Sequence, residues 1–159
     1  MPYIVAATTK EHLAAASSLF SEYAATLPFA LDFQNFAAEL AELPGKYAAP
    51  AGALLLLMDD ADQTAGCVAV RPLARDICEM KRLYLRPTYR GKGWGRLLAA
   101  AAGDAACRLD YRLMRLDTTP GMDAAVAIYQ SLGFKAIPAY CHNPLPGAIF
   151  LEKDLSANS

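Results

Sequence analysis

The sequence predicts a single domain of the α/β (α+β) class, in which helices flank one mixed sheet. Short apolar runs typical of strands alternate with segments of helical periodicity, in the order β-α-α-β-β-β-α-β-α-β-β. The 159 residues are 55% hydrophobic and 19% charged, which is typical of a chain with a compact core. No internal repeat or long linker interrupts this order, so we expect one domain over residues 1–155 and a frayed C-terminus over residues 156–159.

The first third of the chain is expected to form a strand and two helices. An apolar run over residues 3–7 predicts the strand. Apolar side chains then recur at helical spacing over residues 11–27, and Thr9 stands before them as a candidate cap. A second apolar stripe over residues 33–43 follows Asp32, whose carboxylate suits an N-cap.

The middle of the chain is expected to form three strands. The apolar runs 53–58 and 66–72 are separated by a polar turn and therefore predict a hairpin. A third strand over residues 77–85 should stop at Arg86-Pro87, because proline cannot continue a ladder of hydrogen bonds.

Helices and strands are expected to alternate in the last third, where Gly133 suits the position that closes a helix. These elements are expected as helix 93–109, strand 113–117, helix 124–132, and strands 134–137 and 148–154.

Composition excludes several classes of function. A net charge of −1 gives no basic surface for nucleic acid, and the apolar run 51–58 is too short to span a membrane. The four cysteines form no CxxC pair, and with two histidines they make no metal-binding pattern. The N-terminus lacks the features of a signal peptide, so we expect a cytoplasmic protein with reduced thiols and no metal.

A glycine-rich basic turn, RGKGWGR, lies between the strand 77–85 and the helix that follows. It does not fit the P-loop, because no Ser or Thr follows a Gly-Lys pair at the required spacing. It does not complete the dinucleotide pattern GxGxxG, because Arg96 occupies the third glycine position. It does fit the pattern [QR]xxGx[GA], through Arg90, Gly93 and Gly95.

With this pattern the chain resembles the GCN5-related N-acetyltransferase (GNAT) superfamily. A second family signature, an apolar helix ending in Tyr-x-x-x-Gly-Phe, is similar to the segment with Tyr129, Gly133 and Phe134, so the resemblance covers about residues 77–137. It implies the acyl-CoA N-acyltransferase fold with a mostly antiparallel sheet, and an acyltransferase of the EC 2.3.1 class that uses acetyl-CoA as co-substrate. The implied reaction is transfer of the acetyl group to a primary amine of a small molecule by direct attack in a ternary complex. The alternatives are a non-catalytic acyl-CoA-binding or sensing module and a protein N-acetyltransferase.

The resemblance assigns coenzyme binding to the end of the strand and to the turn. Glycine lets the backbone approach a phosphate closely, and the N–H groups at the start of a helix attract an anion. The alternative is a capped helix with a solvated basic face. The coenzyme-binding residues implied by the resemblance are Leu83, Tyr84, Leu85, Arg90, Gly91, Lys92, Gly93, Trp94, Gly95 and Arg96.

Two residues are candidates for proton transfer. In the resembled family a tyrosine at the place of Tyr129 can protonate the leaving thiolate, and the alternative is a core tyrosine. Glu79, a lone carboxylate in an apolar stretch, stands where some members carry a general base. Its alternatives are a salt bridge to Lys81, Arg82 or Arg71 and exposure at the strand start, while a chain of waters could also serve as the base. Many relatives carry an Asn where this chain has Met122, so one contact to the coenzyme could be replaced.

The acceptor would be held, by the same resemblance, between the first helices and the last hairpin. The sequence leaves the class of acceptor open among amino acids, polyamines, aminoglycosides and protein termini. An edge strand near the C-terminus is compatible with a homodimer. The polar acceptor candidates are Glu22, Tyr23, Asp32, Tyr140, His142 and Asn143.

Overall fold

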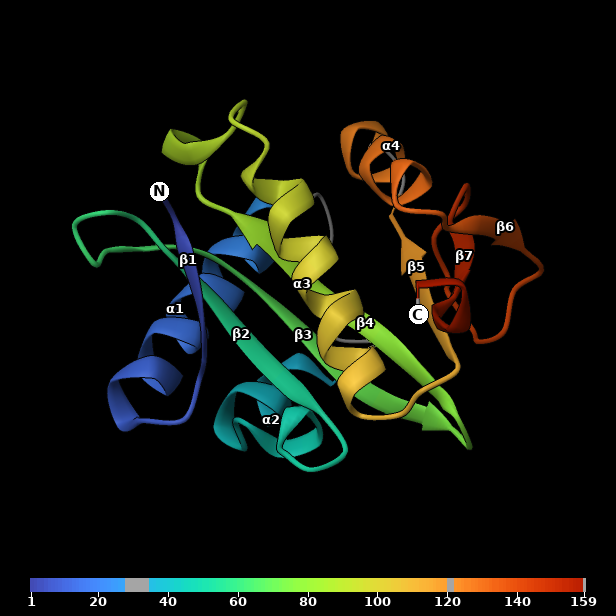
Figure 1. Cartoon of the computed structure of the whole chain (residues 1–159), viewed down its shortest axis with the longest axis horizontal. Coiled ribbons are helices and arrows are strands. Elements are labelled where there is room, and N and C mark those ends of the chain that lie inside the picture. Colours follow the sequence, from blue (N-terminus) through green and yellow to red (C-terminus); the bar gives the residue numbers. More distant parts are fainter. Residues whose placement is uncertain (28–34, 120–121, 159) are drawn as a thin grey trace.

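The computed structural model describes residues 1–27, 35–119 and 122–158, which are arranged around one sheet (Figure 1). The strands are β1 (Tyr3–Ala6), β2 (Ala53–Met58), β3 (Thr64–Ala74), β4 (Ile77–Leu85), β5 (Leu113–Thr118), β6 (Lys135–Ile137) and β7 (Ile149–Asp154). The α-helices are α1 (Lys10–Thr26), α2 (Phe36–Ala41), α3 (Trp94–Arg108) and α4 (Asp123–Ser131), and 3-10 helices span Gly45–Tyr47, Pro87–Tyr89 and Leu155–Asn158. None of the described helices is both long and apolar enough to cross a membrane.

The strands follow the order β1-β2-β3-β4-β5-β7-β6 across the sheet. Neighbouring strands in the described residues run antiparallel, except for β4 and β5, which are parallel. This confirms the predicted fold class, a mixed and mostly antiparallel sheet flanked by helices. The last 3-10 helix, Leu155–Asn158, covers most of the segment that we expected to fray.

Both faces of the sheet are covered, which explains the run of four leucines in β2. Helix α3 lies over one face of β2, β3 and β4, while α1 and α2 lie behind the sheet (Figure 1). Leu55 and Leu57 belong to the buried cluster on the α3 side. Leu54 and Leu56 belong to the buried cluster on the α1 side. A strand that is buried on both faces requires such a continuous apolar run.

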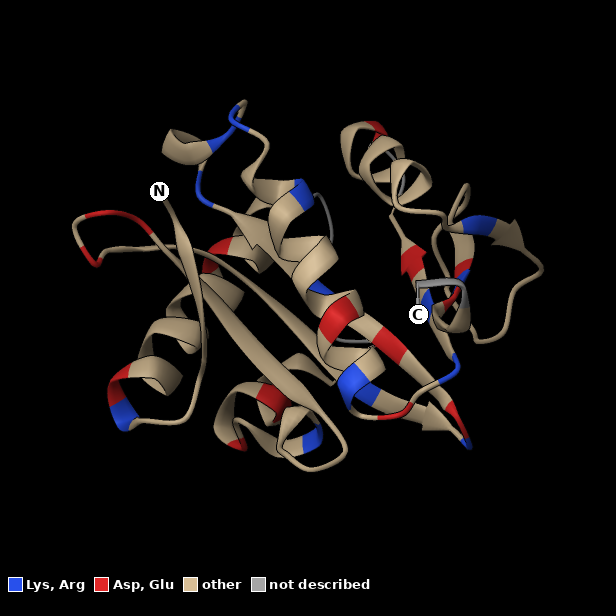
Figure 2. Cartoon of the chain, in the orientation of Figure 1, with Lys and Arg blue, Asp and Glu red and all other residues tan. Residues whose placement is uncertain are grey.

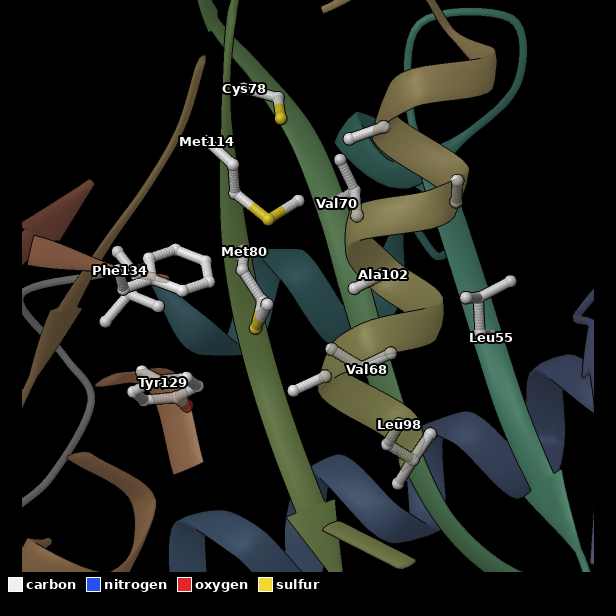
Figure 3. Packing of buried hydrophobic residues seen from close by; sticks show 14 of the residues in the cluster. Leu55, Val68, Val70, Cys78, Met80, Leu98, Ala102, Met114, Tyr129 and Phe134 are labelled. Carbon is white, nitrogen blue, oxygen red and sulfur yellow. The ribbon is translucent and has the colours of Figure 1, made fainter. Parts of the chain in front are cut away.

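Helix α3 packs against the sheet through small side chains. Ala99, Ala102 and Ala106 are buried in the same cluster as Val68 and Val70 of β3. Figure 3 shows Ala102 facing the two valines. The alanine-rich composition of the helix therefore suits a close approach of its backbone to the sheet.

Strands β4 and β5 separate soon after they pair. Their ladder joins residues 77–79 to residues 113–115 and no further residues of the described chain. Beyond it Arg82 has a φ of 61°, and the register with β3 shifts between Cys67 and Ala69. Such a bulge bends its strand. Strand β4 thus carries a bulge and leaves β5 directly after their short ladder.

The helices of the first third differ in how well they were predicted. Thr9 caps α1 as expected, since its hydroxyl accepts a hydrogen bond from the N–H of His12, whose side chain completes a capping box. The second helix is shorter than the predicted 33–43, because Asn35 has a left-handed backbone that does not continue a helix. Asp32, the expected N-cap, lies outside the described residues.

Two other boundaries were wrong. The expected linker 46–50 overlaps a 3-10 turn, Gly45–Tyr47, because the ring of Tyr47 is buried against Phe20. Strand β3 extends beyond the predicted 66–72 at both ends. It tolerates Pro72 because its register with β4 shifts directly after that residue.

Candidate active site

The turn between β4 and α3 presents a row of backbone N–H groups. Gly91 and Gly93 have φ angles of 83° and 81°, a conformation that suits glycine. Gly93 is the N-cap of α3 and has no side chain to satisfy the helix end. In the described part of the chain, no hydrogen bond involves the N–H groups of residues 91–96. Together with the positive end of α3, these groups fit the anionic phosphates of a coenzyme.

Basic residues lie along this turn and at the start of α3, where the ribbon is blue (Figure 2). The Nε atom of Arg90 donates a hydrogen bond to the carbonyl oxygen of Leu85 at 2.9 Å, so it also braces the turn against the end of β4. The ammonium of Lys92 lies 5.3 Å from the centre of the Trp94 ring. These positions agree with a local source of positive charge in a chain whose net charge is −1.

An aromatic pair fixes the path of the turn. The ring of Trp94 stacks on that of Tyr89 at a centroid distance of 5.3 Å. The hydroxyl of Tyr89 donates a hydrogen bond of 2.8 Å to Asp59 in the β2–β3 loop. The pKa of the Asp59 carboxyl is lowered mainly by the backbone N–H of Gln63, and this bond from Tyr89 lowers it further. The turn is therefore held from the sheet side before any ligand binds.

Helices α3 and α4 approach each other closely at the start of α3. A Cβ atom at Gly95 would lie 3.3 Å from Cδ1 of Ile128, which is tighter than ordinary packing. One turn further along α4, the hydroxyl of Ser131 accepts a hydrogen bond of 3.2 Å from Nε of Arg96. Gly95 thus serves helix packing, and Arg96 joins the turn to α4.

A cleft opens where β4 and β5 separate. Of the β4 residues expected to bind the coenzyme, Leu83 lines the cleft. Tyr84 is buried on the α1 side of the sheet, and Leu85 accepts the bond from Arg90. The cleft is lined by Tyr23, Met80, Lys81, Arg82, Leu83, Leu116, Asp117, Thr118, Thr119, Met122, Ala125 and Tyr129.

Tyr129 reaches this cleft from α4. Its side chain is 8% exposed and packs on Phe134, with ring centroids 5.7 Å apart. Among the described residues its hydroxyl makes no hydrogen bond, yet no buried side-chain oxygen there lacks a partner, so the hydroxyl has surface in the cleft. Burial raises the pKa of Tyr129, which keeps the hydroxyl protonated at neutral pH.

The carboxylate of Glu79 is buried and held from two sides. The side chain of Arg71, opposite it on β3, donates from Nε to Oε1 at 2.7 Å. The hydroxyl of Tyr140 donates to Oε2 at 2.5 Å. Burial, followed by the negative charge of Glu79, raises the pKa of Tyr140. Among the three ion-pair partners considered for Glu79, Arg71 is the one that contacts it.

A second pocket adjoins the cleft and shares three of its lining residues, Lys81, Arg82 and Asp117. Its volume is ≈ 340 Å³, which suits a small ligand. We call it the acceptor pocket. It is lined by Asn35, Glu39, Lys46, Tyr47, Arg71, Glu79, Lys81, Arg82, Asp117, Cys141 and His142.

The structure brings together only some of the predicted acceptor residues. His142 lines the acceptor pocket, and Tyr140 contacts Glu79 at its wall. Tyr23 lines the cleft instead. Glu22 lies outside both, in an ion pair with Arg86 at 2.8 Å that lowers the pKa of its carboxyl. Asp32 lies outside the described residues.

Several functional candidates were missed by sequence reasoning. Arg71 and Lys81 entered it only as partners of Glu79, and Asp117 did not enter it. Their common location follows from register, because Arg71 faces Glu79 across β3 and β4 while Lys81 follows two residues later on the same face. The two-residue spacing of Glu79 and Lys81 in the predicted strand was the signal in the sequence that these side chains share a face. Across residues 1–27, 35–119 and 122–158, no group of three or more His, Cys, Asp and Glu is arranged for a metal ion.

Comparison with known proteins identifies relatives of the whole unit. A model of the acetyltransferase (GNAT) domain family matches residues 51–136. An N-acetyltransferase of Schizosaccharomyces pombe, named as uncharacterized, is 40% identical over 139 residues, which are 87% of this chain and 85% of the relative.

Solved structures show the same fold. The putative acyl-CoA N-acyltransferase of Klebsiella pneumoniae is 28% identical with a TM-score of 0.71, covering 98% of this chain and 97% of that one. The PaiA N-acetyltransferase of Thermoplasma acidophilum, in complex with coenzyme A, is 18% identical with a TM-score of 0.72, covering 97% and 99%.

Proposed function

Because this chain belongs to the acetyltransferase (GNAT) domain family and is an N-acetyltransferase by class, we propose that it acetylates a primary amine of a small molecule. The acetyl donor is acetyl-CoA, and the amine attacks it directly while both substrates are bound. The complex of the Thermoplasma relative with coenzyme A supports this choice of donor.

The observation that carries the proposal is the junction of two cavities where β4 leaves β5. The cleft is lined by Leu83 of β4 and by Tyr129 of α4, and the acceptor pocket reaches the same point from Glu79. Two substrates that enter from opposite ends would meet beside Lys81, which lines both cavities. Holding both reactants in this way can supply much of the rate.

Bound acetyl-CoA supplies an activated acetyl group as a thioester. Residues 91–96 bind its phosphates through backbone N–H groups, and the β4 edge beyond residue 79 orients the arm that carries the thioester. Glu79 accepts the proton that the amine loses as its nitrogen bonds to the carbonyl carbon. Tyr129 gives a proton to the sulfur as the carbon–sulfur bond breaks. The products are an N-acetylated amine and the free thiol.

The size of the acceptor pocket favours a small molecule over a protein. At ≈ 340 Å³ the pocket is near the lower end of ligand sites, about 300–1,000 Å³. Its walls come from buried or half-buried strand residues such as Glu79 and Arg71. A folded protein could present only a thin, extended end to such a pocket.

The proposal is tested by following thiol release from acetyl-CoA with a panel of small amines. We expect turnover with at least one of them, and a loss in kcat of about 10²-fold or more in Glu79→Gln, which keeps the shape of the side chain but not its basicity. Coenzyme binding without turnover on any amine would contradict the proposed reaction. Unchanged kcat in Glu79→Gln would assign the base to water.

Replacement of Tyr129 by phenylalanine tests the proton donor. We expect kcat to fall by about 10²-fold, because the ring remains and only the hydroxyl is lost. The free energy of unfolding should change by less than about 0.5 kcal/mol, since the hydroxyl has no partner among the described residues. Steady-state kinetics and urea unfolding measure the two effects. Equal kcat in both proteins would leave Tyr129 as a packing residue of the core.

A further inference from the structure

Within the residues that the structure describes, the acceptor pocket keeps a positive charge without a bonded partner after its hydrogen bonds and ion pairs are taken into account. Glu79 is paired with Arg71 at 2.7 Å. Glu39 receives two hydrogen bonds from Arg82, at 2.8 Å and 2.9 Å. The third carboxylate, Asp117, accepts a hydrogen bond of 3.0 Å from a side-chain amide of the loop after β6. Each acid that lines the pocket is therefore already bonded to a donor of the protein.

Lys81 has no such partner. Within the described ranges, no hydrogen bond or ion pair joins its ammonium to another group. Burial lowers the pKa of Lys81, while the nearby carboxylate of Glu79 acts in the opposite direction. An ammonium that is withdrawn from water without a counter-ion costs free energy. Lys46, exposed at the rim of the same pocket, adds a second positive charge.

We propose that the acceptor is an amine that also carries a carboxylate, and that Lys81 binds this carboxylate. The inference rests on the proposed function and specifies its substrate class. Lys81 and Glu79 lie two residues apart on one face of β4, so their Cα atoms are separated by about 6.5–7 Å. An amino acid bound between them presents its amine to Glu79 and its carboxylate to Lys81.

The same charges disfavour polyamines and other cationic acceptors. An additional ammonium would meet Lys81, while two of the three acids of the pocket are already in ion pairs and the third, Asp117, accepts a hydrogen bond from an amide. A neighbouring positive charge also disfavours the ammonium form of the acceptor. It therefore favours the neutral amine, which is the form that attacks the thioester.

The test uses matched acceptors that differ only in the carboxylate. Thiol release is measured with β-alanine, aspartate and glutamate, with the amides in which every carboxylate of these acids is replaced by a carboxamide, and with spermidine. We expect higher kcat/KM for the acids than for their amides. Lys81→Met should lower kcat/KM for the acids by at least about tenfold, the loss expected for a charged hydrogen bond. It should change the values for the amides less than threefold, and Lys81→Arg should recover part of the loss.

Preference for the amides or for spermidine would overturn the inference and leave the acetyl transfer intact. An equal loss on acids and amides in Lys81→Met would also overturn it. Absence of thiol release with every amine would instead contradict the proposed function. In that case calorimetry with β-alanine and its amide decides the inference. The inference requires that β-alanine binds and that Lys81→Met abolishes this binding. Binding of neither compound, or equal binding of both, would refute it.

Discussion

Replacing Gly93 by valine is expected to raise the KM for acetyl-CoA by about tenfold or more. Gly93 has a φ of 81°, and an L-residue in this region costs about 1–2 kcal/mol, which corresponds to roughly a tenfold change in an equilibrium. The space around a new Cβ atom is open, since apart from its neighbours in the chain no described residue has an atom within 4 Å of it. The chain can therefore relieve the strain by turning the N–H groups of residues 91–96 away from their common direction.

Gly147 offers the matched control. It has a φ of 84° and lies in the loop before β7, so valine there imposes a similar backbone strain outside the turn. We expect Gly147→Val to leave the affinity for coenzyme A unchanged, as measured by calorimetry, and Gly93→Val to weaken it. Similar losses in the two variants would mean that general strain, and not the turn, determines the affinity.

Removal of the carboxylate of Glu39 is expected to destabilise the fold by about 3–5 kcal/mol, the usual effect of breaking a buried ion pair. The Arg82 side chain is 2% exposed and that of Glu39 is 14% exposed. Arg82 also lies 5.3 Å from the ring of Phe36 in α2. The measurement is urea unfolding of Glu39→Ala, of Arg82→Met and of the double variant. The double variant should be more stable than the sum of the single losses predicts, because no charge is left without its partner.

The pair Arg115 and Glu152 provides the comparison. Its side chains are 26% and 24% exposed, and Nε of Arg115 lies 2.7 Å from Oε2 of Glu152. Glu152→Ala should cost less than about 1 kcal/mol, because water can solvate the remaining charge. If both pairs gave the same loss, burial would not be the cause of the effect at Glu39.

Two strands of the sheet were predicted to the residue. Both β2 and β4 are apolar runs with sharp ends, a polar turn after β2 and Arg86-Pro87 after β4. The second helix was predicted too long because Asn35 has a left-handed backbone, which its neighbours do not reveal. The hydrophobic pattern thus predicts the ends of an element correctly when turn residues mark them. It does not predict an end that tertiary contacts decide.

The candidate site divides in the same way. The glycine turn and Tyr129 stand in contiguous motifs, so the chain itself reveals them. The contact of Glu79 with Tyr140 joins residues 61 positions apart and depends on the path of the loop after β6. Glu22 was considered for the acceptor because it lies in the first helix, to which the resemblance assigns part of the acceptor site. In the fold it is paired with Arg86, 64 residues away.

The short parallel ladder between β4 and β5 divides the sheet into two panels. One panel contains β1 to β4, and the other contains β5, β7 and β6. Residues 77–79 and 113–115 are the backbone seam between them, and the cleft begins where the seam ends. A ligand in the cleft touches both panels, so its binding free energy also strengthens their union. The seam is thus the backbone connection between the panels, and a ligand in the cleft adds a second connection beside it.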